Sequence, residues 1–132
     1  MGGSEAIDLV LRACVERGDE VLIPDPAYVS YSPLVTMSDG VPVHVECREE
    51  DNFVLKPEYL EKAITEKTKA IILTYPNNPT GAIMTKEELE AIAEVLIRHD
   101  LLVITDEIYA ELTYGRKHAS IASLPGMKER TV

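Results

Sequence analysis

The sequence predicts an α/β fold, with a parallel sheet of four strands between two layers of helices. Short, uninterrupted apolar runs alternate along the chain with longer segments whose apolar residues recur every three or four positions. Strands joined through helices run in parallel, because each helix returns the chain to the same end of the sheet. The run 69–74 is apolar without alternation, as in a strand that is buried on both faces.

The first segments alternate as this fold requires. Apolar residues at helical spacing predict a first helix from about Ser4 to Val15. Residues 20–24 contain a short apolar strand, and a second helix is expected to end near Ser38 before the turn at Asp39 and Gly40. Together these elements form the first strand-to-helix unit of the sheet.

The next strand differs from the first. Residues 41–45 place valines at alternate positions, which predicts a strand with one exposed face. Pro42 lacks an N–H donor and therefore places this strand at an edge of the sheet. Pro57 then opens a helix that reaches Ile64 and leads to the buried strand 69–74.

The second half of the chain repeats the pattern. Thr85 and Glu88 form a capping-box signature that opens a long amphipathic helix ending near His99. Residues 101–105 are a further apolar strand, and Asp106 emerges from its carboxyl end.

Charge and cysteine content exclude several classes of function. The chain has 132 residues and a formal net charge of −10, which repels nucleic acid and anionic membranes. No apolar run is long enough to span a membrane. Cys14 and Cys47 are too few for a disulfide framework and lack the spacing of zinc ligands. We expect one domain in the cytoplasm, without a metal site.

A rigid loop, Tyr-Pro-Asn-Asn-Pro-Thr-Gly at 75–81, leaves the strand 69–74. Carboxyl ends of parallel strands meet at one edge of a sheet, where open α/β folds bind ligands. The residues expected along this edge are Tyr28, Asn78, Asp106 and Tyr109. Gly3 and Ser4 begin a helix whose first N–H groups suit a phosphate. A flat, phosphorylated, nitrogen-containing ring would match these groups, whereas an ordinary stiff loop and a plain helix start are the structural alternatives.

Four motifs, in this order and spacing, resemble those of the class I and II aminotransferases, which are fold-type I enzymes dependent on pyridoxal 5′-phosphate (PLP). The motifs are Gly3-Ser4-Glu5-Ala6, Asp25-Pro26-Ala27-Tyr28, Asn78-Pro79-Thr80-Gly81 and Asp106-Glu107-Ile108-Tyr109. The resemblance covers essentially the whole chain. Each motif is weak alone, but their joint order is specific.

The resemblance implies seven cofactor-binding residues: Gly3, Ser4, Glu5, Tyr28, Asn78, Asp106 and Tyr109. The first three would hold the phosphate through backbone N–H groups, and Tyr28 would stack on the pyridine ring. Asn78 and Tyr109 would contact the phenolic oxygen of the ring, while Asp106 would keep the pyridine nitrogen protonated. The structural alternatives are a local cap for Asp106, a core position for Tyr109, and packing of Tyr28 on the following helix.

The family's chemistry also needs a lysine that forms a Schiff base with PLP, in a Ser-x-Ser-Lys-like context. The chain has no lysine in that context, so we expect no catalytic residue in it. Residues 1–132 are interpreted as one fragment of the PLP-binding large domain, without the catalytic-lysine segment and the small domain. PLP binding by this fragment is expected to be weak or absent.

The resemblance also implies features of the backbone. It places the four strands, within a larger sheet, in the order 70–75, 101–105, 20–24, 41–45. Strand 69–74 would then be an unprotected apolar edge, because Thr131 and Val132 only begin the strand expected beside it. This predicts self-association as a homo-oligomer, by edge pairing or by burial of apolar helix faces. The bond between Asn78 and Pro79 is expected to be cis.

The parent protein is thus predicted to be an aminotransferase of amino acid metabolism, moving an amino group from an amino acid to a 2-oxo acid. A PLP-dependent carbon–sulfur lyase or a PLP-binding regulatory module of the same fold is the alternative. A different class of function is a Mg²⁺-dependent phosphate-handling domain with Asp25 and Asp106 as ligands. A folding unit without a ligand is the remaining possibility.

Overall fold

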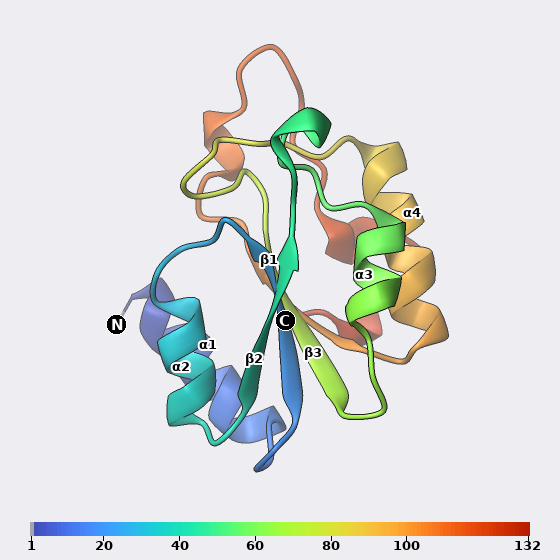
Figure 1. Ribbon diagram of the computed structural model, residues 1–132. Helices are drawn as coiled ribbons and strands as arrows, with labels where there is room; N and C mark the ends of the chain where they lie inside the picture. The colour runs from blue at the N-terminus through green and yellow to red at the C-terminus, as the bar shows by residue number, and fades with distance from the viewer. Residues whose placement is uncertain (1) are drawn as a thin grey trace.

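A computed structural model describes residues 2–132 and contains three layers, with helices on both sides of a central sheet (Figure 1). The strands are β1 (Glu20–Asp25), β2 (Val41–Glu46), β3 (Thr68–Thr74) and β4 (Leu102–Asp106). The main helices are α1 (Gly3–Cys14), α2 (Tyr31–Met37), α3 (Pro57–Ala63) and α4 (Lys86–Arg98). Short 3₁₀ segments are η1 (Glu49–Asp51), η2 (Ala110–Leu112), η3 (Ile121–Ser123) and η4 (Lys128–Arg130). The predicted α/β fold class is confirmed.

All strand pairs are parallel, and the strands lie in the order β2-β1-β3-β4. The predicted edge position of β2 is therefore confirmed, since β2 pairs with β1 alone among the four strands. The expected order 70–75, 101–105, 20–24, 41–45 is wrong, because β3 lies between β1 and β4. Side chains could not reveal this, because adjacent strands pair through backbone groups that every residue carries.

The outer edge of the sheet consequently belongs to β4, not to β3. Thr131 forms a parallel bridge with Val103. The N–H of Val132 donates to the Val103 carbonyl at 2.9 Å, and the N–H of Thr105 donates to the Val132 carbonyl at 2.9 Å. Thr131 and Val132, which were expected to begin a strand beside 69–74, form an isolated bridge beside β4 instead. The prediction of an open apolar edge on β3 is thus wrong.

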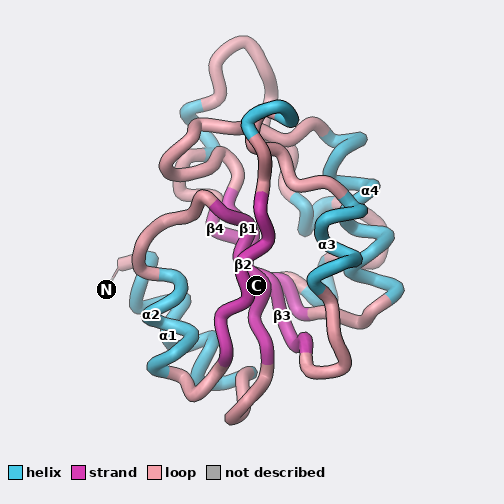
Figure 2. The backbone as a smooth tube through the Cα atoms, in the orientation of Figure 1, coloured by secondary structure: helices cyan, strands magenta, loops and turns pink. Residues whose placement is uncertain are grey.

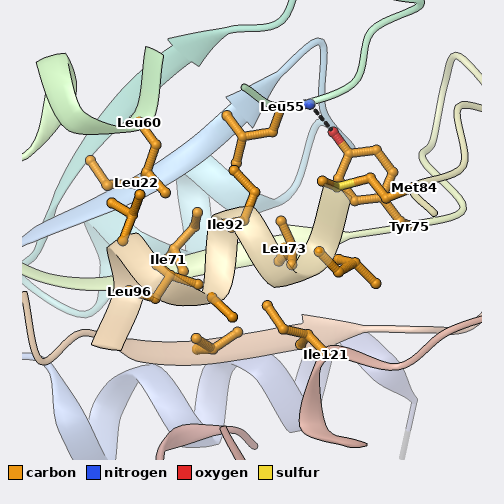
Figure 3. Close-up of a cluster of buried hydrophobic side chains, with 14 of the residues drawn as sticks. Leu22, Leu55, Leu60, Ile71, Leu73, Tyr75, Met84, Ile92, Leu96 and Ile121 are labelled. Atoms are coloured by element: carbon orange, nitrogen blue, oxygen red, sulfur yellow. Dashed lines mark hydrogen bonds between the residues drawn. The ribbon is translucent and has the colours of Figure 1, made fainter. Parts of the chain in front are cut away.

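Two hydrophobic cores explain why β1 and β3 lack alternation. Leu22, Ile71 and Leu73 pack in the core on the side of α3 and α4, shown in Figure 3. Val21 and Ile72 point the other way, into the core beneath α1 and α2. Helices cover both faces of the sheet (Figure 2), so both sets of side chains leave water.

A local sequence signal defines the start of α4. The N–H of Thr85 donates to Oε2 of Glu88 at 2.8 Å, and the N–H of Glu88 donates to Oγ1 of Thr85 at 3.2 Å. This is the capping box predicted for α4.

Within the described residues, no helix combines the length and the apolar character needed to cross a membrane.

Tyr75 anchors the loop that follows β3. Its hydroxyl accepts a hydrogen bond from the N–H of Leu55 at 3.0 Å (Figure 3). The same hydroxyl donates to the carbonyl of Phe53 at 3.1 Å. The side chain is buried, so these bonds satisfy a hydroxyl that water cannot reach. The loop 75–81 therefore leaves the sheet from a fixed point.

Candidate functional site

A cavity of about 460 Å³ lies at the carboxyl ends of the strands, between the start of α1 and the loop after β4. Its walls come from four separate parts of the chain. The lining residues are Gly3, Ser4, Ala6, Ile7, Tyr28, Tyr31, Asn78, Thr105, Asp106, Glu107, Ile108 and Tyr109. The predicted convergence of Tyr28, Asn78, Asp106 and Tyr109 near the start of α1 is therefore confirmed.

The first turn of α1 forms one wall of the cavity. Gly2 is the N-cap residue in an extended conformation, and its carbonyl accepts from the N–H groups of Glu5 at 3.1 Å and Ala6 at 3.2 Å. Gly3 and Ser4 precede these bonded amides, in the part of a helix whose N–H groups have no intrahelical partner. A Cβ atom added to Gly3 would meet nothing within 4 Å. Packing therefore does not require a glycine here, and the missing side chain leaves space in the cavity.

Glu5 is the one predicted site residue that does not line the cavity. Its side chain is exposed, and its N–H already donates to Gly2. The other six predicted residues all lie on the cavity wall.

Asp106, the last residue of β4, places a carboxylate at the cavity that is held by two hydrogen bonds. Its Oδ2 accepts a hydrogen bond from the hydroxyl of Tyr31 at 2.8 Å, and its Oδ1 accepts from the N–H of Ile108 at 3.2 Å. The Tyr31 hydroxyl in turn accepts from Oγ1 of Thr74 at 2.7 Å. Tyr31 and Thr74 are both buried. The carboxylate is thus oriented by a chain of hydrogen bonds that reaches into the protein.

Burial, followed by the hydrogen bond to Asp106, raises the pKa of Tyr31 well above its ordinary value, although the bond from Thr74 opposes the shift. The phenol therefore stays protonated and continues to donate to Asp106. Sequence reasoning missed both Tyr31 and Thr74. The available signals were a second tyrosine close after Tyr28 and a hydroxyl residue at the end of β3.

The loop 75–81 brings Asn78 to the cavity. Asn77 holds the loop: its Nδ2 donates to the Pro26 carbonyl at 3.2 Å, and its Oδ1 accepts from the Thr80 hydroxyl at 2.8 Å. The bond between Asn78 and Pro79 is cis, as predicted. The two neighbouring asparagines thus have different roles: Asn77 stabilises the loop by hydrogen bonds, and Asn78 lines the cavity.

Aromatic side chains supply the remaining surface. The rings of Tyr28 and Tyr31 meet edge to face, with centroids 5.5 Å apart and an interplanar angle of 79°. Tyr28 is 36% exposed, which leaves part of its ring open to the cavity. Tyr109 lies at the start of the 3₁₀ segment η2. These groups offer a ring face and a phenol to a ligand.

The metal-binding alternative required Asp25 and Asp106 to meet. Asp25 does not line the cavity, and its Oδ1 lies 3.4 Å from Nδ1 of His44. Across residues 2–132, no group of three or more His, Cys, Asp or Glu side chains is arranged to hold a metal ion. The cavity wall, as far as residues 2–132 form it, also contains no lysine.

Known proteins resemble the chain over its full length. The sequence model of the family "Aminotransferase class I and II" matches residues 1–131. The putative aminotransferase YugH of Bacillus subtilis (strain 168) is 52% identical over 132 residues, covering 100% of this chain and 34% of that protein. The aspartate aminotransferase of the same strain is 49% identical over 133 residues, covering 99% of this chain and 34% of its own length.

Solved structures agree with the sequence relatives. The aromatic aminotransferase from Pyrococcus horikoshii OT3 has a TM-score of 0.96 at 50% identity, covering 98% of this chain and 35% of that structure. The aspartate aminotransferase from Thermus thermophilus with maleate has a TM-score of 0.94 at 42% identity, with 98% and 34% covered. The chain spans about a third of the length of the curated relatives it matches. It belongs to the class I and II aminotransferase family, whose members are transferases that use pyridoxal 5′-phosphate.

Proposed function

We propose that this chain is the central part of the large domain of a PLP-dependent aminotransferase, and that the cavity holds the cofactor. The observation that carries the proposal is the convergence of Asp106, Asn78, Tyr109 and the start of α1 on one cavity. These residues come from three separate segments of the chain, and local structural preference does not require them to meet. The whole protein would move an amino group between an amino acid and a 2-oxo acid.

The cavity fits PLP in size and in chemistry. A volume of about 460 Å³ is within the usual range for a small-molecule site. The open space at Gly3 and the N-terminal end of α1 suit a phosphate. The N–H groups of Gly3 and Ser4 would hold that phosphate. The N–H of Glu5 would have to divide between the phosphate and the Gly2 carbonyl.

The other residues would orient the ring. Tyr28 would cover one ring face, and Asn78 and Tyr109 would hydrogen-bond the phenolic oxygen. Asp106 would hold a proton on the pyridine nitrogen, because a carboxylate favours the charged form of that nitrogen. When bound, PLP supplies an electron sink for the reacting amino acid. Tyr31 would keep the Asp106 carboxylate turned toward the ring.

The chain's own residues would bind and orient the cofactor, while the catalytic lysine would come from another part of the parent protein. The named relatives include aspartate and aromatic-amino-acid aminotransferases, so both acidic and aromatic amino acids are candidate substrates. A carbon–sulfur lyase of the same fold would share this cavity. A regulatory module that binds PLP would share it too.

We further propose that the parent acts in amino acid metabolism in the cytoplasm and forms a homo-oligomer. Cys14 and Cys47 are both free thiols, as is usual in a reducing compartment. The solvent-exposed hydrophobic side chains include Leu9, Val29, Met37 and Ile108, which would be covered by further parts of the protein or by a second copy.

A PLP titration of the chain tests the cofactor assignment. The change in PLP absorbance should give weak, reversible binding, and borohydride reduction followed by mass spectrometry should label no single lysine stoichiometrically. D106N should weaken binding about tenfold, because it removes a charged hydrogen-bond partner. The control is D25N, which alters a similar carboxylate outside the cavity and should bind PLP like the wild type. Equal affinities for D106N and the wild type would reject the assignment.

The full-length parent tests the reaction. D106N should lower its transamination rate more than its PLP affinity, because the neutral amide no longer favours the protonated ring nitrogen. Phosphate hydrolysis that depends on Mg²⁺, without a spectral response to PLP, would support the metal-dependent alternative instead.

A further inference from the structure

The loop that carries Tyr109 is held by polar contacts more than by burial. It runs from the end of β4 to η3, and every residue from 105 to 120 is partly or fully exposed. Ile108 is 72% exposed and Tyr114 is 85% exposed. Hydrophobic packing, which anchors α1 and α4, therefore contributes little to the position of this loop.

Glu107 joins the two ends of the loop. Its Oε1 accepts hydrogen bonds from Oγ1 of Thr105 at 3.1 Å and from Oγ of Ser120 at 2.7 Å. Its Oε2 lies 2.8 Å from Nε2 of His118. His118 and Ser120 follow Glu107 by 11 and 13 positions, so these bonds close the loop across its base. Both partners of the Glu107–His118 contact are partly buried, with side chains 24% and 18% exposed.

A tight turn connects Glu107, whose hydrogen bonds close the loop, to Tyr109, which lies two residues after it. The N–H of Ala110 donates to the Glu107 carbonyl at 2.9 Å, and the N–H of Leu112 donates to the Tyr109 carbonyl at 2.8 Å. The backbone of Tyr109 is therefore coupled directly to the backbone of Glu107. A shift of Glu107 would move the Tyr109 phenol relative to the cavity.

We infer that Glu107 is the positioning residue for Tyr109: it closes the 107–120 loop through His118 and Ser120 and thereby holds the Tyr109 phenol at the cavity. Glu107 also lines the cavity, but both of its carboxylate oxygens already have partners within the chain. It acts through Tyr109 and not by contact with the ligand. The inference rests on the proposed function only in naming PLP as the ligand that Tyr109 would meet.

Trypsin offers a test without any ligand, because Arg116 and Lys117 are exposed within the loop. E107A should be cleaved after these residues about tenfold faster than the wild type, since loss of the closing bonds raises the population of open loop. The control is E61A, which removes a comparable carboxylate that lies 2.8 Å from Nη2 of Arg98 and 3.0 Å from Nε2 of His99, away from the loop. E61A should be cleaved in the loop at the wild-type rate. An unchanged rate for E107A would overturn the inference.

Two milder variants cover the case in which E107A fails to fold. S120A removes one closing bond and leaves Glu107 in place, whereas E107Q keeps an oxygen acceptor for Ser120. The cleavage rate should rise more for S120A than for E107Q. Wild-type rates for both would overturn the inference.

A double-mutant cycle measures whether Glu107 acts through Tyr109. E107A should weaken PLP binding about tenfold in the wild-type background, and by much less in a Y109F background, where the phenol is already lost. A purely structural role would give the same loss in both backgrounds, and that result would overturn the inference. If the wild-type chain shows no PLP binding, which the missing catalytic lysine allows, the same cycle in the full-length parent tests the proposed ligand. The proteolysis rates then decide the role of Glu107 alone.

Discussion

The phenol oxygen of Tyr31 lies 2.8 Å from Oδ2 of Asp106, and this hydrogen bond links the start of α2 to the end of β4. Tyr31 is only 2% exposed, so its hydroxyl depends on Asp106 and Thr74 for hydrogen-bond partners. The carboxylate is therefore oriented before any ligand enters. Such preorganisation is what a site needs to hold a proton at a chosen ring atom.

Replacing Tyr31 with phenylalanine should weaken both the fold and the site. Y31F removes the donor to Asp106 and the acceptor for Thr74, so we expect the free energy of unfolding to fall by about 1–3 kcal/mol. PLP affinity should fall as well, because Asp106 is less well oriented. Urea denaturation and PLP titration measure the two effects. The double variant Y31F/T74V should recover part of the stability, since it leaves no buried hydroxyl at position 74 without an acceptor. PLP affinity equal to that of the wild type would contradict the role assigned to Tyr31.

Side chains added at Gly3 should affect ligand binding without affecting folding. A Cβ at this position meets nothing within 4 Å, and alanine favours the helix more than glycine does. We therefore expect G3A to melt no earlier than the wild type, while G3A and then G3L bind PLP progressively more weakly. G2A is a matched control, because a Cβ at Gly2 is also unobstructed but Gly2 does not line the cavity. Equal weakening by G2A would show that the effect is not specific to the cavity.

The Tyr75 hydroxyl should contribute measurably to the stability of the protein. Y75F would leave the N–H of Leu55 and the carbonyl of Phe53 without their partner in a buried setting, at a cost of about 1–3 kcal/mol. The comparison is Y59F, which removes a hydroxyl that donates to Asp51 at 2.9 Å in a more exposed place. Chemical denaturation should rank the variants with Y75F less stable than Y59F. The reverse order would contradict this assignment.

Stability at high pH should depend on Cys47. Burial raises the pKa of this thiol from 9.0 to about 11, so the folded state retains the proton over a range in which the unfolded chain loses it. The contribution of the neutral thiol to stability is complete below the unfolded pKa and is lost as the pH rises through about 11. The difference in free energy of unfolding between the wild type and C47A should therefore shift against the wild type over this interval. A constant difference would contradict the raised pKa.

Much of the fold was predictable from local patterns. The uninterrupted apolar run of β3 indicated burial on two faces, and the two cores on either side of Ile71 and Ile72 account for it. Pro42 correctly placed β2 at an edge. Proline has no N–H, so in an inner strand of a sheet it would leave one hydrogen bond of the ladder unmade. Thr85 and Glu88 formed the predicted capping box, since that motif needs only residues within one turn.

The errors share a different cause. The expected strand order came from the family resemblance and exchanged β3 and β4. The side-chain patterns could not correct it, because helices cover both strands and their patterns are alike whichever neighbour they have. The edge that was assigned to β3 belongs to β4, where Thr131 and Val132 pair with it. Backbone pairing, and not side-chain character, determines these neighbours.

The sequence by itself determined the fold class and the positions of Tyr28, Asn78, Asp106 and Tyr109 at the carboxyl ends of strands, because periodicity and turn chemistry are local properties. The family followed from the resemblance of four motifs in their joint order. The tertiary structure alone decided which side chains hydrogen-bond and orient the site residues. Tyr31 reaches Asp106 across 75 positions, and Glu107 reaches Ser120 across 13 positions. A hydroxyl or carboxylate is compatible with many partners, and only the packing of the strands and helices brings one of them within hydrogen-bonding distance.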